Sequence, residues 1–105
     1  MLLSSTEQIQ GQNYQTLGLV QGTTVQSVNA LKDIGAGFKT LVGGELKSYN
    51  EMMKTARGLA TQRMIDQAAA MGADAIIGVR YTTSSIMQGA AEVIAYGTAV
   101  KILNK

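Results

Sequence analysis

The strongest constraint on the fold is that the C-terminal third of the chain is apolar at nearly every position rather than at alternate ones. Two such stretches follow one another closely, Gly72–Tyr81 and Ala90–Ile102. A strand that is apolar on both sides has to be covered on both faces of its sheet. The chain offers one long helix, which can cover one face. A second copy of the chain is the simplest cover for the other face, so we expect a homo-oligomer.

The composition also favours assembly. At 105 residues the chain has the length of one domain, and we expect an extended N-terminal arm over residues 1–14 followed by a single domain over 15–105. Charged residues make up 15% of the chain, whereas soluble domains usually carry about 25%. A monomer so poor in charge would expose a large apolar surface.

Several classes of function are disfavoured by residues that the chain lacks. It has no Cys and no His, so the usual nucleophile–base pairs of covalent catalysis are missing, and we expect no enzymatic activity, no catalytic residue and no cofactor. The nine Lys and Arg residues are scattered, unlike the basic patch of a nucleic-acid-binding protein. Neither a signal-peptide pattern nor an apolar run of ~18 residues is present. We therefore expect a cytoplasmic protein without nucleic-acid or membrane partners.

The pattern along the chain predicts an α+β protomer with the order β-α-β-β. Strand character over 16–21 and 24–28 is interrupted by Gly22, which suits a bulge or a break. A glycine-rich connector over 29–44 precedes the helix, and the two apolar stretches follow it as a hairpin. A crossover would make the first and second strands parallel, so the last strand fits between them. We expect a three-stranded antiparallel sheet with the helix on one face, and extra short strands that aid oligomer assembly.

The helix is expected to run from about residue 48 to residue 71. Ser48–Glu51 has the form of a capping box, and Gly72 suits a left-handed C-terminal cap. Ile65 falls on the polar side, whereas Arg63 falls on the apolar side, where a buried charge needs a partner. The expected apolar face consists of Tyr49, Met52, Met53, Ala56, Leu59, Ala60, Met64 and Met71, with Arg63 and Gln67 also inside its arc.

Five short segments are distinctive in combination: Asp33–Gly37, Gly43–Tyr49, Ala56–Arg57, Gly72–Gly78 and Gly97–Val100. Together they resemble the YbjQ-like family of small bacterial proteins, over about residues 15–103. The resemblance implies a dodecin-like β-α-β-β fold and assembly into ring-shaped pentamers. It also brings the label of a heavy-metal-binding domain.

That label fits the residues of this chain poorly. Soft and borderline metals prefer thiolate or imidazole ligands, and Cys and His are absent. Four of the six methionines lie on the expected core face of the helix, where Met commonly fills irregular gaps. We therefore predict no metal site. A weak carboxylate site for a hard ion, with one Glu from each subunit around a ring axis, is the remaining metal alternative.

The candidate site consists of the three arginines and of acidic and aromatic residues among apolar neighbours: Glu45, Tyr49, Arg57, Arg63, Arg80, Tyr81, Glu92 and Tyr96. One interpretation is structural ion pairing within or between subunits. The other is a polar ligand pocket at a subunit interface. Arg80 and Glu92 are expected to lie nearly opposite each other if the hairpin turn centres on residues 86–87.

These observations predict a non-enzymatic oligomeric module, most simply a pentameric ring, that binds a small ligand or a protein partner. A metal-binding protein, as the family label has it, is the alternative. Neither the composition nor the motifs identify the ligand.

Overall fold

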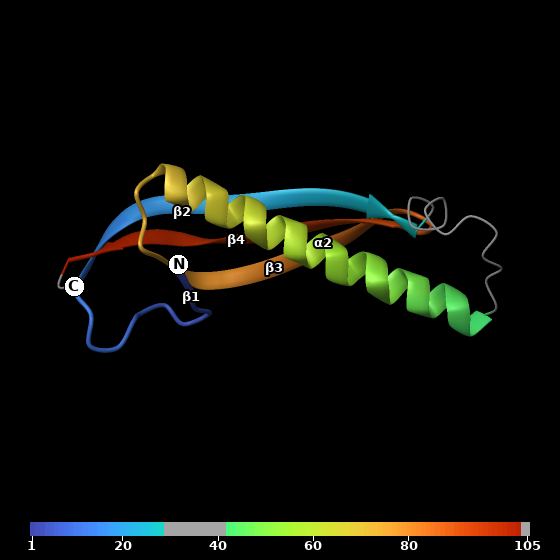
Figure 1. The fold of residues 1–105 in the computed structure, drawn as a ribbon, viewed down its shortest axis with the longest axis horizontal. Helices are drawn as coiled ribbons and strands as arrows, with labels where there is room; N and C mark the ends of the chain where they lie inside the picture. Colours follow the sequence, from blue (N-terminus) through green and yellow to red (C-terminus); the bar gives the residue numbers. More distant parts are fainter. Residues whose placement is uncertain (29–41, 104–105) are drawn as a thin grey trace.

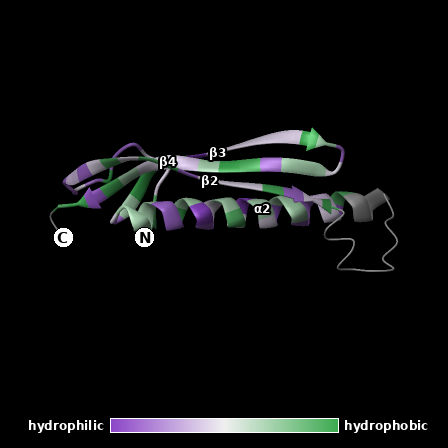
Figure 2. Ribbon diagram, turned by 90° about the horizontal axis from the view of Figure 1, so that it is seen from above, coloured by the Kyte–Doolittle hydropathy of each residue, from purple (hydrophilic) through white to green (hydrophobic). Residues whose placement is uncertain are grey.

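The computed structural model of the protein describes residues 1–28 and 42–103, with side chains from residue 46 onward in the second range. One long helix lies along one face of a four-stranded sheet (Figures 1 and 2). The elements are β1 (Leu2–Leu3), β2 (Tyr14–Ser27), α2 (Val42–Ala70), β3 (Ala75–Met87) and β4 (Ala90–Ile102). In the part of the chain that the structure describes, no helix combines the length and apolar character that crossing a membrane requires. Most of the predicted connector over 29–44 lies outside the described residues.

The strand order is β1-β3-β4-β2. Strand β4 pairs antiparallel with both β2 and β3, so the expected central place of the last strand is confirmed. The expected three-stranded antiparallel sheet is wrong, because β1 adds a fourth strand and pairs parallel with β3 through Leu2↔Ala75 and Leu3↔Ile76. An edge strand presents unpaired backbone groups that need partners. Strand β1 has only two residues, too few to produce a recognisable strand pattern in the sequence.

The N-terminal segment covers more than the edge of the sheet. The amides of Gly78 and Val79 donate to the carbonyl oxygens of Thr6 (2.7 Å) and Ser4 (3.0 Å). Farther along, the segment packs on the sheet face opposite α2 through Ile9, which contacts the cluster of Ala75, Ile77 and Val100 together with Tyr14, the first residue of β2. Part of the second sheet face is therefore covered by the chain itself. The sequence interpretation had assigned that cover to a second copy.

Helix α2 ends where the sequence predicts and begins earlier. Gly72 has a φ of 81°. Its amide donates to the carbonyl oxygen of Ala69, and the amide of Ala73 donates to the carbonyl oxygen of Ala68. These are the two hydrogen bonds of a Schellman cap. The start at Val42 places the predicted capping box inside the helix. At the N-terminal end of α2, the local sequence signal therefore does not set the helix boundary, because tertiary contacts commonly override local helix preferences.

The helix packs on the sheet through a narrow line of residues spaced by four. These side chains are at most 1% exposed: Met52, Ala56, Ala60, Met64 and Ala68. The last four belong to one core cluster with sheet residues such as Val20, Ala95 and Ala99. Small side chains on this face of β4, such as Ala95 and Ala99, let the helix pack closely on the sheet.

The closest approach of helix and sheet is at Gly22 of β2. A Cβ atom at this position would clash with the carbonyl oxygen of Ala60 and the amide nitrogen of Met64, and would lie 2.9 Å from the Cβ of Arg63. Backbone therefore meets backbone, which only a glycine permits. Gly22, predicted to break a strand, instead lies inside one continuous strand.

This close approach explains which helix residues were assigned to the wrong side. Leu59 and Met71, expected in the core, are 38% and 40% exposed. Ile65, expected on the polar side, packs against the core. A helix pressed onto the sheet buries the line that faces the sheet directly, so the wider apolar arc of an ordinary amphipathic helix predicts burial poorly here.

Candidate functional site

A large part of the sheet face opposite α2 is open beyond the area covered by the N-terminal segment. We call this the outer sheet face and define its apolar part by Leu19, Val25, Ile94 and Tyr96. Leu19 and Val25 are 69% and 55% exposed, and Tyr96 is 37% exposed. Their strands are neighbours, with Leu19 opposite Thr98 and Val25 opposite Glu92. The structure therefore presents an apolar strand surface to solvent.

The predicted site residues do not form one cluster. Arg80, Glu92 and Tyr96 alternate with core residues of β3 and β4 and so lie on the outer sheet face. Tyr49, Arg57 and Arg63 belong to α2, and Tyr81 reaches the helix side, where its hydroxyl lies 2.8 Å from Thr61 Oγ1. Glu45 lies in α2, but its side chain is outside the described residues. The sheet thus separates the set into two groups.

The predicted opposition of Arg80 and Glu92 is wrong. Strand pairing places Tyr96 opposite Arg80 and Ser84 opposite Glu92. The reason is the turn, which lies at residues 88–89, with Met87 paired to Ala90, and not at residues 86–87. Arg80 instead donates from Nη1 to the carbonyl oxygens of Ser5 (2.7 Å) and Val79 (3.0 Å).

Arg63 is exposed, contrary to its expected place among buried residues, and its hydrogen-bond partner is a backbone group and not a carboxylate. Its Nη1 donates to the carbonyl oxygen of Thr23 at 2.7 Å. One turn along the helix, Gln67 Oε1 accepts a hydrogen bond from the amide of Gln21, also at 2.7 Å. Strand β2 is an edge strand, and exposed edges invite pairing with other chains. These two side chains therefore occupy the open edge of β2, which gives Arg63 a structural role.

We expect Arg63→Ala to lower the free energy of unfolding by about 1 kcal/mol, because it removes a charge-assisted hydrogen bond that is partly screened by solvent. The matched control is Arg57→Ala on the same helix, an exposed residue for which a change within about 0.5 kcal/mol is expected. Urea unfolding at equal protomer concentration measures both. Equal losses from the two variants would contradict the structural role of Arg63.

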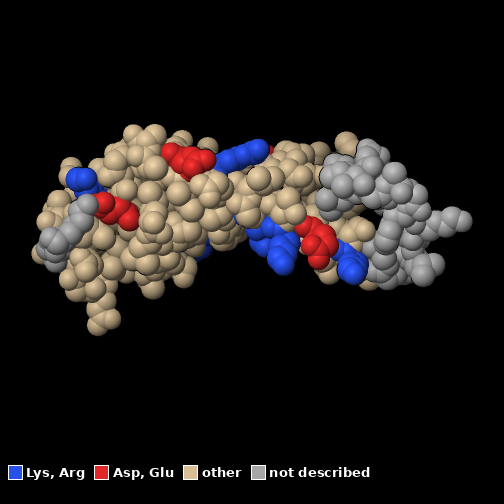
Figure 3. Space-filling model, in the orientation of Figure 1, with Lys and Arg blue, Asp and Glu red and all other residues tan. Residues whose placement is uncertain are grey.

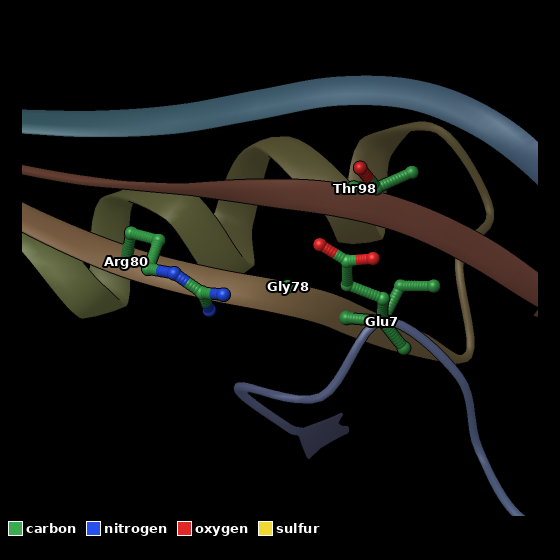
Figure 4. A pocket seen from close by; sticks show the side chains of 5 residues that line it. Glu7, Gly78, Arg80 and Thr98 are labelled. Carbon is green, nitrogen blue, oxygen red and sulfur yellow. The ribbon is translucent and has the colours of Figure 1, made fainter.

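A pocket of about 340 Å³ opens beside Arg80 (Figure 4). It is lined by Glu7 of the N-terminal segment, Thr98 of β4, and Ile77, Gly78 and Arg80 of β3. The pairing of β3 with β4 is irregular between Ile77 and Arg80, and Gly78 has a φ of 61°. A bulge of this kind bends a strand and redirects its side chains, and here it provides the floor of the pocket.

The sequence analysis named one of these residues, Arg80. The bulge at Gly78 could have been predicted, because a glycine within an apolar strand indicates a bulge or a close backbone approach. Glu7 and Thr98 carried no such signal. Glu7 enters the pocket only because the N-terminal segment folds back along β3 through the hydrogen bonds of Ser4 and Thr6.

Metal-ligating groups do not gather in the described part of the chain. Among those residues, no three His, Cys, Asp or Glu side chains lie close enough to hold an ion. Met52 and Met64 are at most 1% exposed, and Met64 belongs to the core cluster between helix and sheet. On the face drawn in Figure 3, charged side chains are few and the two signs are interspersed.

The fold and the whole length of the chain have known counterparts. A crystal structure of a protein of unknown function from Pediococcus pentosaceus, assigned to the DUF74 family, has a TM-score of 0.62 at 18% identity and covers 98% of both chains, which shows a shared fold. A UPF0145 protein of Clostridium novyi is 60% identical over 103 residues, covering 98% of this chain and 100% of the relative. Another, from Pseudothermotoga lettingae, is 57% identical and covers 97% of each. The family model described as "Putative heavy-metal-binding" matches residues 1–103, so the chain belongs to this YbjQ family, as the five sequence motifs suggested.

Proposed function

We propose that the protein is a non-enzymatic homo-oligomeric module, a closed ring in which the outer sheet face packs against a neighbouring copy and a small ligand binds at the rim of that contact. The observation that carries the proposal is the exposure of Leu19, Val25 and Tyr96 on one strand surface. Five subunits follow from the family resemblance. Lack of His and Cys supports a binding role over a catalytic one.

A second copy is the occupant that suits this surface best. Apolar side chains lie there beside uncharged polar ones, such as Gln21 and Thr23 on β2 and Thr82 on β3, as in the cores of interfaces, where charge is scarce. Glu92 and Arg80 are charged residues of the same face, opposite Ser84 and Tyr96 on the neighbouring strand. The hairpin adds further apolar area at its end, where Ile86 and Met87 are 50% and 65% exposed. Surfaces of this kind on a short, charge-poor chain favour self-association.

The assembly is tested by Leu19→Lys, which places a charge in the proposed contact. Light scattering at micromolar protomer concentration should show a ring for the parent and dissociation for this variant, because burying an unpaired charge is costly. Leu59→Lys, on the helix, is the matched control and should remain assembled. A parent protein that is a stable monomer would refute the proposal.

Native mass spectrometry of protein purified without an affinity tag separates the proposal from the metal-binding alternative. We expect a ring without zinc or copper, because the chain cannot supply four nitrogen or sulfur ligands of the usual kind. A retained small ligand would appear as added mass on the assembled ring. Stoichiometric zinc or copper that survives a chelator wash would establish the alternative.

A further inference from the structure

Two opposite charges face the pocket beside Arg80 without pairing. In Figure 4 the Glu7 carboxylate and the Arg80 guanidinium point toward the space above Gly78 from opposite sides. Within the described residues, the Glu7 side chain has no hydrogen bond or ion pair. The two charges thus line one pocket without contacting each other.

The guanidinium group of Arg80 is held in place by hydrogen bonds to the backbone. Its Nη1 donates to two backbone carbonyl oxygens, Ser5 O at 2.7 Å and Val79 O at 3.0 Å. These bonds fix the plane of the guanidinium while its other N–H groups stay available, and a planar fork of donors suits a carboxylate. The backbone carrying Glu7 is fixed as well, because the Thr6 carbonyl oxygen accepts from the amide of Gly78 at 2.7 Å.

The space between the two charges stays open because the residue that lies between them is Gly78. Gly78 has no side chain, and a Cβ built on it would meet nothing within 4 Å. The pocket volume of about 340 Å³ lies at the small end of the range for ligand pockets, roughly 300–1,000 Å³. Thr98 adds a hydroxyl at the wall, which can donate or accept a hydrogen bond.

We infer that this pocket binds a small zwitterion of the amino-acid class, with its carboxylate on the free N–H groups of Arg80 and its ammonium group on the carboxylate of Glu7. A ligand with both charges matches the unpaired acid and base together, whereas a simple anion would leave Glu7 facing a like charge. Arg80 lies opposite Tyr96 on the outer sheet face, so the pocket adjoins the proposed subunit contact. The inference rests on the proposed function in that respect.

The test uses the assembled full-length protein and three probes of similar size: L-alanine, propionate, which lacks the amine, and ethylamine, which lacks the acid. Binding is followed by the amide resonance of Gly78 in two-dimensional NMR titrations. We expect saturable binding of L-alanine, with propionate and ethylamine weaker by about tenfold or more, because each lacks one charge-assisted contact. Equal binding of propionate and L-alanine would reduce the pocket to an anion site and overturn the inference.

Glu7→Gln isolates the ammonium contact. The residue is exposed, and its side chain has no partner among the described residues, so folding should be unaffected. L-Alanine should then bind about tenfold more weakly or worse, approaching propionate, whereas Glu51→Gln on α2, with the same loss of charge, should bind like the parent. Unchanged affinity in Glu7→Gln would overturn the inference.

Light scattering on the same samples separates failure of the inference from failure of the proposed function. An assembled ring that shows no saturable shift with L-alanine refutes the zwitterion site and leaves the assembly standing. A monomer that binds L-alanine through Glu7 refutes the ring and leaves the site standing.

Discussion

Gly22→Ala is expected to lower the free energy of unfolding by about 3 kcal/mol, near the upper end of the usual cost of overpacking. The added methyl group would meet the Ala60 carbonyl oxygen and the Met64 amide nitrogen. Both atoms belong to the helix backbone, so no side-chain rotation can relieve the contact. The helix would have to move away from β2, which would also strain the hydrogen bonds that Arg63 and Gln67 make to that strand.

Gly58→Ala is the matched control and should have the opposite sign. Gly58 lies in the interior of α2, is exposed, and a Cβ there would meet nothing within 4 Å. Alanine is the better helix former, so a gain of about 0.5–1 kcal/mol is expected. Urea unfolding at matched protomer concentration measures both variants. Similar losses at the two positions would mean that the close helix–strand contact at Gly22 does not exist in solution.

Met64→Ala is expected to cost about 2–5 kcal/mol, the range for removing a large buried aliphatic side chain and leaving a cavity. Met64 is 0% exposed and belongs to the core cluster between helix and sheet. Met64→Leu conserves the volume and should cost less than about 1.5 kcal/mol.

Met71→Ala provides the control for Met64, because Met71 is 40% exposed and should lose less than about 1 kcal/mol. Thermal and urea unfolding should rank the three variants in the order of the volume removed from the core. A Met64→Leu protein as unstable as Met64→Ala would show that the sulfur atom, and not the volume, is what the site requires.

The central place of β4 was predictable because a helical crossover makes β2 and β3 parallel, so that the last strand fits between them. The layering of helix on sheet was predictable because apolar residues on both sides of a strand require cover on both faces. The end of α2 was predictable because a glycine in the left-handed conformation is a local requirement of the cap, met at Gly72 with a φ of 81°.

The partner of Arg63 shows where the prediction reached its limit. An Arg within an apolar arc required a partner, and the sequence favoured a carboxylate. The structure supplies the carbonyl oxygen of Thr23, which every residue possesses and no sequence pattern marks. The hairpin gave a similar result: its two strands were clear, but a turn displaced along the chain changed every cross-strand pair, so that Arg80 faces Tyr96 and not Glu92.

By itself, the sequence determined the class of the fold, the helix–sheet layering and the central strand, because periodicity, small-residue rows and caps act within one element. Only the tertiary structure decided the strand register, the start of α2 and the return of the N-terminal segment along β3. It also decided the candidate pocket, since Glu7 comes to line the same pocket as Arg80 and Thr98 only through contacts between segments far apart in the chain. Such contacts depend on the geometry of turns and bulges, where a shift of a single residue changes which side chains meet.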